Sequence, residues 1–319
     1  MNILVTGAAG FIGFHLCKKL HELNYEVIGY DNFNNFYDLD LKLNRAKILK
    51  EKFNIQIIKG DIQNKEKIEE ILNENNISHV FHLAALAGVL PSIKYPFEYV
   101  QTNINGFLSI LESCKNFKDL KLIFASSSSI YGMTEDIPFV ETNKTNKPTS
   151  LYGATKKADE LIAYTYSNIY DMKIIGLRFF TVYGPWGRPD MAYYKFTKKI
   201  SNNEPIDIYN FGKMQRDFTY IDDIIDGVVS VLNKDFENFE VFNLGNNNPI
   251  KLMNLVEIIE NNLNKKAKIN FLPFQKGEVI KTYADINKAN KFLNFYPKTS
   301  FEKGMKKFIS WYKNYHLST

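Results

Sequence analysis

Short apolar runs alternate with stretches of helical periodicity through the first half of the chain. Residues 1–6 form an apolar, β-rich run, residues 15–20 place apolar side chains at helical spacing, and residues 25–30 form a second apolar run. Further strand-like runs occur at residues 55–59, 80–83 and 120–124. This strand–helix–strand rhythm predicts an α/β protein with a Rossmann-type, doubly wound parallel sheet.

The pattern becomes mixed beyond Arg178. Its amphipathic and strand-like segments predict helices at 191–202 and 254–264, and short strands at 206–209, 241–244 and 269–272. We therefore expect a Rossmann domain over residues 1–177 and a smaller mixed α/β substrate lobe, mainly over residues 178–319. Segments around 215–245 are expected to cross back into the first domain.

Glycines stand at the first strand-to-helix turn, with the spacing Gly7-x-x-Gly10-x-x-Gly13. Gly7 allows a tight turn, Gly10 lets the backbone approach a pyrophosphate, and Gly13 lets helix and strand pack closely. Phe11 and Ile12 open the helix, whose free N–H groups can bind phosphate. The pattern predicts a dinucleotide site rather than a glycine-rich turn without a ligand.

Two acidic residues follow later strands of the same unit. Asp31 ends the second strand, where a carboxylate accepts ribose hydroxyls and repels a 2′-phosphate, which favours NAD over NADP. Asp61, followed by Ile62, is a candidate partner for the adenine amino group. Asp61 could also be the N-cap of a helix over 64–72, and the two roles are compatible.

Small and hydroxylated residues follow the next two strands. The segment Leu83-Ala84-Ala85 would let a cofactor lie against the backbone. Four consecutive serines follow the run at 120–124. Such a run is often a linker, but ligands bind at the carboxyl ends of strands in doubly wound folds, so functional hydroxyls are the better interpretation.

Tyr152 and Lys156 are one turn apart on a predicted helix and therefore share a face. A lysine ammonium beside a phenol favours the ionised phenol. A tyrosine tuned in this way can act as a general base on a sugar or alcohol hydroxyl. Tyr-x-x-x-Lys alone is a weak signal, and the dinucleotide pattern upstream gives it weight.

Composition excludes several other classes. The net charge of +5 comes from 40 basic and 35 acidic residues spread along 319 positions, which does not indicate nucleic-acid binding. No apolar run is long enough to span a membrane, and the N-terminus does not resemble a signal peptide. Cys17 and Cys114 are predicted to be reduced core thiols of a cytoplasmic protein, and the five histidines show no metal-ligand spacing.

These motifs together resemble the extended short-chain dehydrogenases/reductases, in the nucleotide-sugar epimerase group. The resemblance rests on the glycine turn, His82-Leu-Ala-Ala85, Thr102-Asn103, the serine run, Tyr152 with Lys156, Arg178-Phe-Phe-Thr181-Val-Tyr-Gly-Pro185 and Arg216-Asp-Phe-Thr-Tyr-Ile-Asp-Asp223. Trp186-Gly-Arg188-Pro-Asp190-Met-Ala192, Gly277-Glu-Val and Thr282-Tyr-Ala-Asp285 resemble the UDP-glucuronate 4-epimerase branch.

The resemblance implies an NAD-dependent 4-epimerase of a UDP-sugar, with UDP-glucuronate and UDP-galacturonate as the expected pair. Tyr152 would take the proton from the sugar 4-hydroxyl, helped by Ser127, while Lys156 binds the nicotinamide ribose. Asn103 joins the cofactor site by the same analogy. NAD would stay bound and be recycled through a 4-keto sugar, and the activity would serve polysaccharide biosynthesis.

Ser128 and Ser129 would face the sugar, and they separate this chain from related enzymes. The 4,6-dehydratases of the superfamily carry an Asp-Glu pair at these positions, and UDP-glucuronate decarboxylases carry a Glu at the second. Elimination needs an acid/base pair, so two serines favour simple epimerisation.

The sugar itself is open to alternatives. Arg188 is the candidate for a uronate carboxylate, with Thr181 as an extra donor, although Arg188 could instead pair with Asp190 on a surface loop. Uronate epimerases commonly carry Gln and Arg where this chain has Leu86 and Leu90, which favours a neutral or N-acetylated sugar.

Three further questions stay open from the sequence. Arg216 is the candidate for the diphosphate, with a structural pair to Asp217, Asp222 or Asp223 as the alternative. Helices near 92–114 and 151–170 would pair across a homodimer, or their apolar faces could belong to the core. The chain could also be a nucleotide-sugar reductase or dehydrogenase, or a dinucleotide sensor without catalysis.

Overall fold

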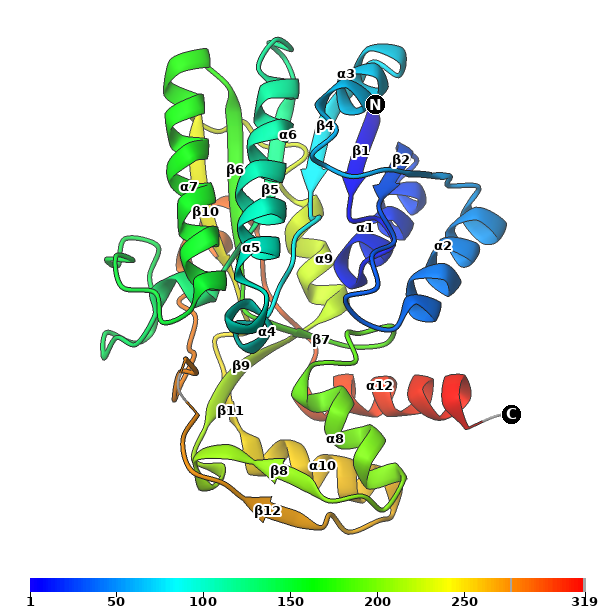
Figure 1. Ribbon diagram of the computed structural model, residues 1–319, viewed down its shortest axis with the longest axis vertical. Coiled ribbons are helices and arrows are strands. Elements are labelled where there is room, and N and C mark those ends of the chain that lie inside the picture. Colours follow the sequence, from blue (N-terminus) through cyan, green and yellow to red (C-terminus); the bar gives the residue numbers. More distant parts are fainter. Residues whose placement is uncertain (276, 318–319) are drawn as a thin grey trace.

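A parallel seven-stranded sheet forms the larger lobe of the computed structural model, which describes residues 1–275 and 277–317 (Figure 1). Its strands lie in the order β10-β6-β5-β4-β1-β2-β3. They are β1 (Asn2–Thr6), β2 (Glu26–Asp31), β3 (Ile57–Lys59), β4 (Ile77–His82), β5 (Lys121–Ser127), β6 (Lys173–Phe179) and β10 (Phe239–Leu244). The prediction of a Rossmann-type doubly wound sheet is confirmed.

Helices cover both faces of this sheet, and successive residues of one strand enter different cores. Ile3 and Val5 of β1 pack in the core that includes Phe14 of α1, whereas Leu4 between them packs with Ile68 of α3 and Phe107 of α6. The flanking helices are α1 (Phe11–Glu22), α2 (Leu39–Phe53), α3 (Lys65–Glu74), α6 (Gly106–Cys114), α7 (Leu151–Tyr170) and α9 (Ile221–Val229). Burial on both faces explains the continuous apolar runs in these strands.

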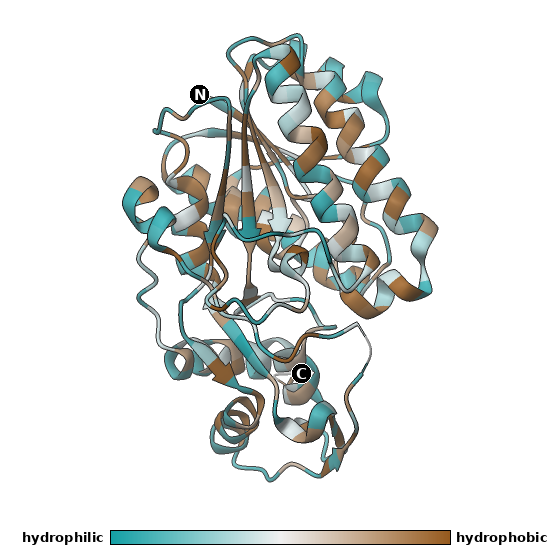
Figure 2. Ribbon diagram, turned by 90° about the vertical axis from the view of Figure 1, so that its left-hand side faces the viewer, coloured by the Kyte–Doolittle hydropathy of each residue, from teal (hydrophilic) through white to brown (hydrophobic). Residues whose placement is uncertain are grey.

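Among the described residues, the smaller lobe contains two short sheets and three α-helices. The strand order β11-β9-β7 makes one sheet, and β12 pairs with β8 in the other. Its elements are β7 (Thr181–Tyr183), α8 (Ala192–Ser201), β8 (Ile206–Ile208), β9 (Gln215–Tyr220), β11 (Pro249–Lys251), α10 (Leu252–Leu263), β12 (Ile269–Phe271) and α12 (Phe301–His316). The hydropathy colouring shows apolar residues concentrated along the strands of the large sheet (Figure 2).

Chain segments cross between the two lobes. β10 lies at the edge of the large sheet, hydrogen-bonded to β6, although it follows several elements of the smaller lobe. A short helix, α11 (Asn287–Leu293), packs against β10. The division of the chain into domains at residue 177, with segments around 215–245 crossing back into the first domain, stays a prediction.

Two local expectations differ from the structure. The side chain of Asn64 caps α3 by accepting from the Lys67 N–H, so the prediction of an Asp61 cap is wrong. The predicted helical region 92–114 is broken into α4 (Val89–Lys94), α5 (Pro96–Tyr99), a π-helix (Val100–Asn105) and α6. Pro96, which cannot donate an N–H to a continuing helix, stands at the first position of α5.

Candidate active site

One cavity of about 400 Å³ lies at the carboxyl ends of the central strands and is lined by both lobes. Most of the predicted site residues line it together: Gly7, Gly10, Phe11, Ile12, Gly13, Asp31, Ile62, Leu83, Ala84, Ala85, Ser127, Ser128, Ser129, Tyr152, Lys156, Thr181, Arg188 and Arg216. The carboxyl edge of a doubly wound sheet is where such folds bind ligands.

The glycine turn has the close backbone contacts that its sequence predicts. Gly7 has a φ of +71°, and a Cβ there would lie 2.8 Å from the backbone nitrogen of Ala84. A Cβ on Gly13 would collide with the Gly7 carbonyl oxygen. Gly10 is the N-cap of α1 without a side-chain cap, so the first N–H groups of the helix stay available to an anion.

Asp31 is a buried carboxylate at the end of β2. Its oxygens accept hydrogen bonds from the N–H groups of Ala9, at 3.0 Å, and Phe33, at 2.8 Å. Each carboxylate oxygen can accept more than one hydrogen bond, so these contacts orient Asp31 and still leave room for hydroxyl donors.

Two predicted cofactor residues do not line the cavity. Asp61 lies beside it, where its carboxylate accepts from Asn32 Nδ2 and from the backbone N–H of Gln63. Asn103 is buried, and its amide bonds both the N–H and the carbonyl of Leu86 as well as Thr155 Oγ1. Asn103 therefore joins the β4 loop to α7 in this structure.

The serine run begins inside β5 and ends in a 3-10 turn (Ser128–Tyr131). Ser127 Oγ accepts from the Ser129 N–H at 3.1 Å, which starts this turn and directs the hydroxyls toward the cavity. Ser126 also lines the cavity, and its hydroxyl donates to Glu160 at 2.7 Å. The run is therefore a structured strand end and not a linker.

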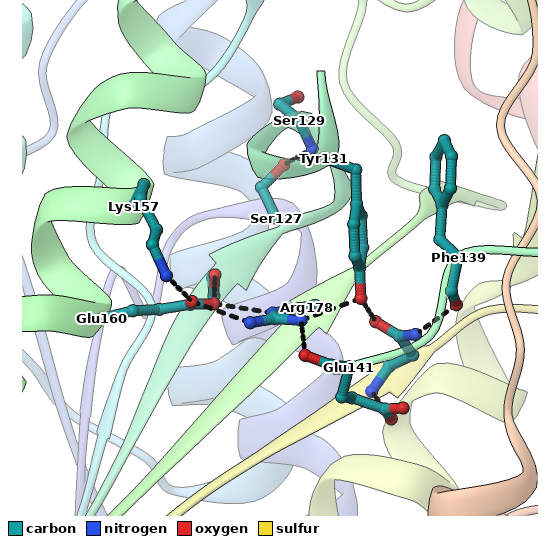
Figure 3. Close-up of polar contacts among 10 residues, drawn as sticks. Ser127, Ser129, Tyr131, Phe139, Glu141, Lys157, Glu160 and Arg178 are labelled. Carbon is teal, nitrogen blue, oxygen red and sulfur yellow. Dashed lines mark hydrogen bonds and ion pairs between the residues drawn. The ribbon is translucent and has the colours of Figure 1, made fainter. Parts of the chain in front are cut away.

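A buried polar network supports this strand end (Figure 3). Arg178 of β6 bonds both carboxylate oxygens of Glu160 on α7, at 2.8 and 2.9 Å, and donates to the Tyr131 hydroxyl. Tyr131 in turn donates to Asn243 of β10. Burial alone would raise the pKa of Glu160, but the hydrogen bonds and charge of Arg178 hold that pKa below its ordinary value.

Helix α7 carries Tyr152 and Lys156 into the cavity. Ser150 caps this helix by accepting from the Gly153 N–H at 3.1 Å. The Lys156 ammonium is almost fully buried and bonds Asp159 at 3.1 Å. Burial raises the pKa of Asp159 to about 6, against the attraction of Lys156. The second carboxylate oxygen of Asp159 is buried without a partner among the described residues.

His82 at the end of β4 is close enough to Lys156 to be affected by its charge. Burial, with a smaller contribution from Lys156, lowers the pKa of His82 to about 3. The neutral ring bonds Thr6 Oγ1 at 2.9 Å. A neutral histidine beside the buried ammonium adds no second positive charge to this part of the site.

The two predicted substrate arginines already have carboxylate partners. Arg188 makes two bonds to Asp190, at 3.0 and 2.6 Å, and a third to the Ala87 carbonyl. This pairing with Asp190 is the alternative that the sequence left open. Arg188 nevertheless lines the cavity and does not lie on an exposed surface loop. Arg216 bonds Glu278 at 2.8 Å, so its partner is none of the three aspartates that the sequence offered.

The sequence interpretation missed several cavity residues after Asp31. They are Asn32, Asn34, Phe36, Tyr37 and Lys42, in the loop after β2 and the first turns of α2. The run Asn32-Phe-Asn-Asn-Phe-Tyr37, rich in aromatic and amide side chains, was the available signal. The described residues contain no group of three or more His, Cys, Asp or Glu side chains that could hold a metal ion.

The sequence model of the family described as GDP-mannose 4,6 dehydratase matches residues 4–308. The chain belongs to this family of extended short-chain dehydrogenases/reductases. A protein of Methanocaldococcus jannaschii, MJ1055, is 50% identical over 98% of this chain and 96% of its own length. UDP-glucuronate 4-epimerase 4 of Arabidopsis thaliana is 44% identical over 99% of this chain and 76% of its own.

A solved structure of this family extends the likeness to both lobes. The UDP-glucuronic acid 4-epimerase of Bacillus cereus, in complex with UDP-glucuronic acid and NAD, is 37% identical and has a TM-score of 0.93. The match covers 99% of this chain and 100% of that chain. The family resemblance inferred from the motifs is confirmed.

Proposed function

We propose that this protein is an NAD-dependent 4-epimerase that interconverts UDP-glucuronate and UDP-galacturonate. The observation that carries the proposal is one cavity that brings together the glycine turn, Ser127, Tyr152 and Lys156. The relatives named above support the same reaction. They include UDP-glucuronate 4-epimerases whose similarity extends over almost the whole of this chain.

The cavity fits a nicotinamide dinucleotide. The glycine turn excludes a side chain where a pyrophosphate would lie, the start of α1 offers free N–H groups, and Asp31 offers a carboxylate to ribose hydroxyls. Bound NAD supplies reversible hydride acceptance and return at the sugar C4. Ala84 and Ala85 present backbone and small side chains to the same space.

Tyr152 acts as the general base and acid in this proposal. Its phenolate takes the proton of the sugar 4-hydroxyl as C4 is oxidised, and returns a proton when C4 is reduced on the other face. Lys156, one helical turn from Tyr152, binds the nicotinamide ribose with its buried ammonium. Ser127 hydrogen-bonds the same sugar oxygen during both steps.

The UDP-sugar occupies the part of the cavity nearer the smaller lobe. Arg216 binds the diphosphate after exchanging its bond to Glu278. The hydroxyls of Ser128, Ser129 and Thr181 donate hydrogen bonds to the sugar. Arg188 contributes positive charge beside the carboxylate of the uronate. Two serines in place of an acid/base pair leave no group for elimination, which supports epimerisation over dehydration.

A second candidate is 4-epimerisation of a neutral or N-acetylated UDP-sugar. It is favoured by Leu86, a buried apolar residue of the cavity, and by the bidentate pairing of Arg188 with Asp190. Both features reduce the positive charge and hydrogen-bonding capacity offered to a carboxylate.

We also propose a cytoplasmic homodimer that supplies a nucleotide sugar for polysaccharide biosynthesis. Buried, unpaired Cys17 and Cys114 are in keeping with a reducing compartment. Among the described residues, no helix is both long and apolar enough to cross a membrane. Apolar side chains on the outer face of α7 support self-association.

Incubation of the purified protein with UDP-glucuronate, without added NAD, tests the function. We expect conversion to UDP-galacturonate, measured by chromatography of the nucleotide sugars. Protein that carries NAD but converts only neutral or N-acetylated UDP-sugars would establish the second candidate. Net accumulation of reduced cofactor would instead indicate a dehydrogenase.

A further inference from the structure

Lys42 on α2 is a buried cation in the wall of the cavity. Only 5% of the residue is exposed, and it lines the cavity with Asp31 and Asn34. Its ammonium donates to Asn34 Oδ1 at 2.8 Å and lies 4.9 Å from the centre of the Tyr37 ring. An ammonium has three N–H donors, and no acceptor for the other two occurs among the described residues.

No described carboxylate lies within ion-pair distance of Lys42. Its neighbour one turn away, Arg45, is fully buried and donates to the carbonyls of Ala9 and Trp186 and to the Tyr37 hydroxyl, again without a carboxylate. Two buried cations without an acidic partner are costly in the folded protein. A ligand anion would supply the missing charge.

The surroundings of Lys42 indicate where such an anion would lie. Burial lowers the pKa of Lys42, the charge of Asp31 opposes this change, and the charges of Arg45 and Arg188 add to it. Asp31 marks the ribose end of the dinucleotide site, and Arg188 belongs to the loop at the substrate end. Arg45, on the same helix, holds the Ala9 carbonyl of the glycine turn. Lys42 therefore lines the same cavity as Asp31 and the glycine turn, and its helix is tied to that turn.

We propose that Lys42 binds the diphosphate of the dinucleotide cofactor, adding a side-chain cation to the N–H groups of the glycine turn and α1. The inference rests on the dinucleotide site of the proposed function and not on the epimerisation itself. The free N–H groups of the ammonium donate to phosphate oxygens, while Asn34 and Tyr37 fix its direction.

The test uses Lys42→Met, with Lys47→Met as the matched control because Lys47 is exposed on the same helix. NAD retained after prolonged dialysis is measured first. NAD-depleted protein is then titrated with NAD, ADP and adenosine by calorimetry. We expect Lys42→Met to bind NAD and ADP about 10- to 100-fold more weakly, as for one charge-assisted hydrogen bond, and to bind adenosine as before. Lys42→Arg should recover part of the loss.

Stability of the NAD-depleted protein separates ligand binding from a structural role. Met removes a buried, uncompensated charge, so Lys42→Met should unfold at the same temperature as the parent or higher. Unchanged NAD affinity, equal losses for ADP and adenosine, or a clear drop in unfolding temperature would each overturn the proposal.

These outcomes are distinct from failure of the proposed function. The parent protein could bind NAD, and the Lys42→Met variant could bind it more weakly, while the parent converts no UDP-sugar. This result would refute the epimerase function and leave the role of Lys42 intact. Parent protein that binds neither NAD nor ADP would refute both.

Discussion

Single side chains of the cavity have charges and orientations set by their neighbours. The Lys156 ammonium donates to Asp159, and burial together with the charge of Lys156 lowers the pKa of nearby His82, so its ring is neutral. Arg188 and Arg216 are held by carboxylates in the same cavity. The reactive groups are therefore preorganised, which lowers the reorganisation needed during reaction.

Replacing Tyr152 by Phe tests the assignment of the base. The phenol proton acceptor is lost while the ring is kept, so turnover of UDP-glucuronate should fall at least about 100-fold. NAD content and unfolding temperature should stay close to those of the parent. Tyr164→Phe is the control, because Tyr164 is exposed on the outer face of the same helix. Near-normal turnover in Tyr152→Phe would reject this role.

The Arg188→Lys variant tests recognition of the uronate carboxylate. Lysine keeps the charge but loses the planar, two-point geometry of the guanidinium. We expect the KM for UDP-glucuronate to rise about tenfold, while the KM for a neutral UDP-sugar changes little. Equal effects on both substrates would assign Arg188 to the loop structure through Asp190 and Ala87.

At the scale of elements, the buried network joins β5, β6, β10 and α7 behind the site. Arg178 is its centre, with Glu160 and Tyr131 as direct partners (Figure 3). The serines on β5 and the Tyr152 helix are thereby held in one arrangement. Neighbouring strand ends could otherwise shift relative to α7.

The Glu160→Gln variant should be strongly destabilised. It leaves the buried Arg178 without its carboxylate partner, a change that typically costs about 3–5 kcal/mol. Urea unfolding measures the loss, with Lys157→Met as control because Lys157 lies at the rim of the network, 3.6 Å from Glu160. A loss below about 1 kcal/mol would mean that the network is not a main support of the fold.

The buried Asp217 is expected to make the stability of the protein depend on pH. It is fully buried in β9 and accepts from the N–H groups of Asn246 and Ala284. Burial raises the pKa of Asp217 to about 6, and these hydrogen bonds oppose the rise. A folded-state pKa above the unfolded value of about 3.9 means that the folded chain holds the proton longer as pH rises.

The contribution of Asp217 is therefore fully present below pH 4 and is lost between about pH 4 and 6. The free energy of unfolding of the parent, minus that of Asp217→Asn, should fall by up to about 3 kcal/mol over this range. The asparagine NH₂ faces backbone donors, which adds a penalty that does not vary with pH. Unfolding curves at pH 4, 5, 6 and 7 measure the difference, and a flat or rising difference would contradict the expectation.

At the scale of the whole molecule, α7 has two contrasting faces. One carries Tyr152 and Lys156 into the cavity, while the other exposes Leu161, Tyr164 and Ile169, of which Ile169 is 64% exposed. Leu108 of α6 is also exposed. Neighbouring apolar groups on one surface are typical of a protein–protein contact.

If this face forms the homodimer, Leu161→Glu should convert a dimer into monomers. Burying an unpaired carboxylate at the contact is costly, so the dissociation constant should rise at least about 100-fold. Sedimentation of the parent and variant measures it. Met133→Glu introduces the same charge at an exposed apolar residue outside α7 and should remain dimeric. A monomeric parent would reject the dimer.

Local spacing was sufficient for much of this protein. Short apolar runs alternating with period-3.6 segments predicted the doubly wound sheet, and glycine spacing with Asp31 predicted the dinucleotide turn, because both depend on residues near in sequence. Tyr152 and Lys156 could be predicted to share one face of a helix, because four residues make about one helical turn. Asn64 was missed as the cap of α3 because Asp61 is an equally good cap by residue type, and only the backbone path distinguishes them.

Only the tertiary structure decided which distant groups meet. Several hydrogen bonds join residues whose separation in sequence carries no information on contact. They connect Arg216 to Glu278, Arg178 to Tyr131 and Glu160, and Asn103 to Leu86. The burial of Lys42 without an acidic partner is likewise invisible in the sequence, where lysine normally indicates a solvated surface. Pairing and burial of charges depend on how strands and helices from the whole chain pack, and that packing placed Arg188, Arg216, the serines and Lys42 around one cavity.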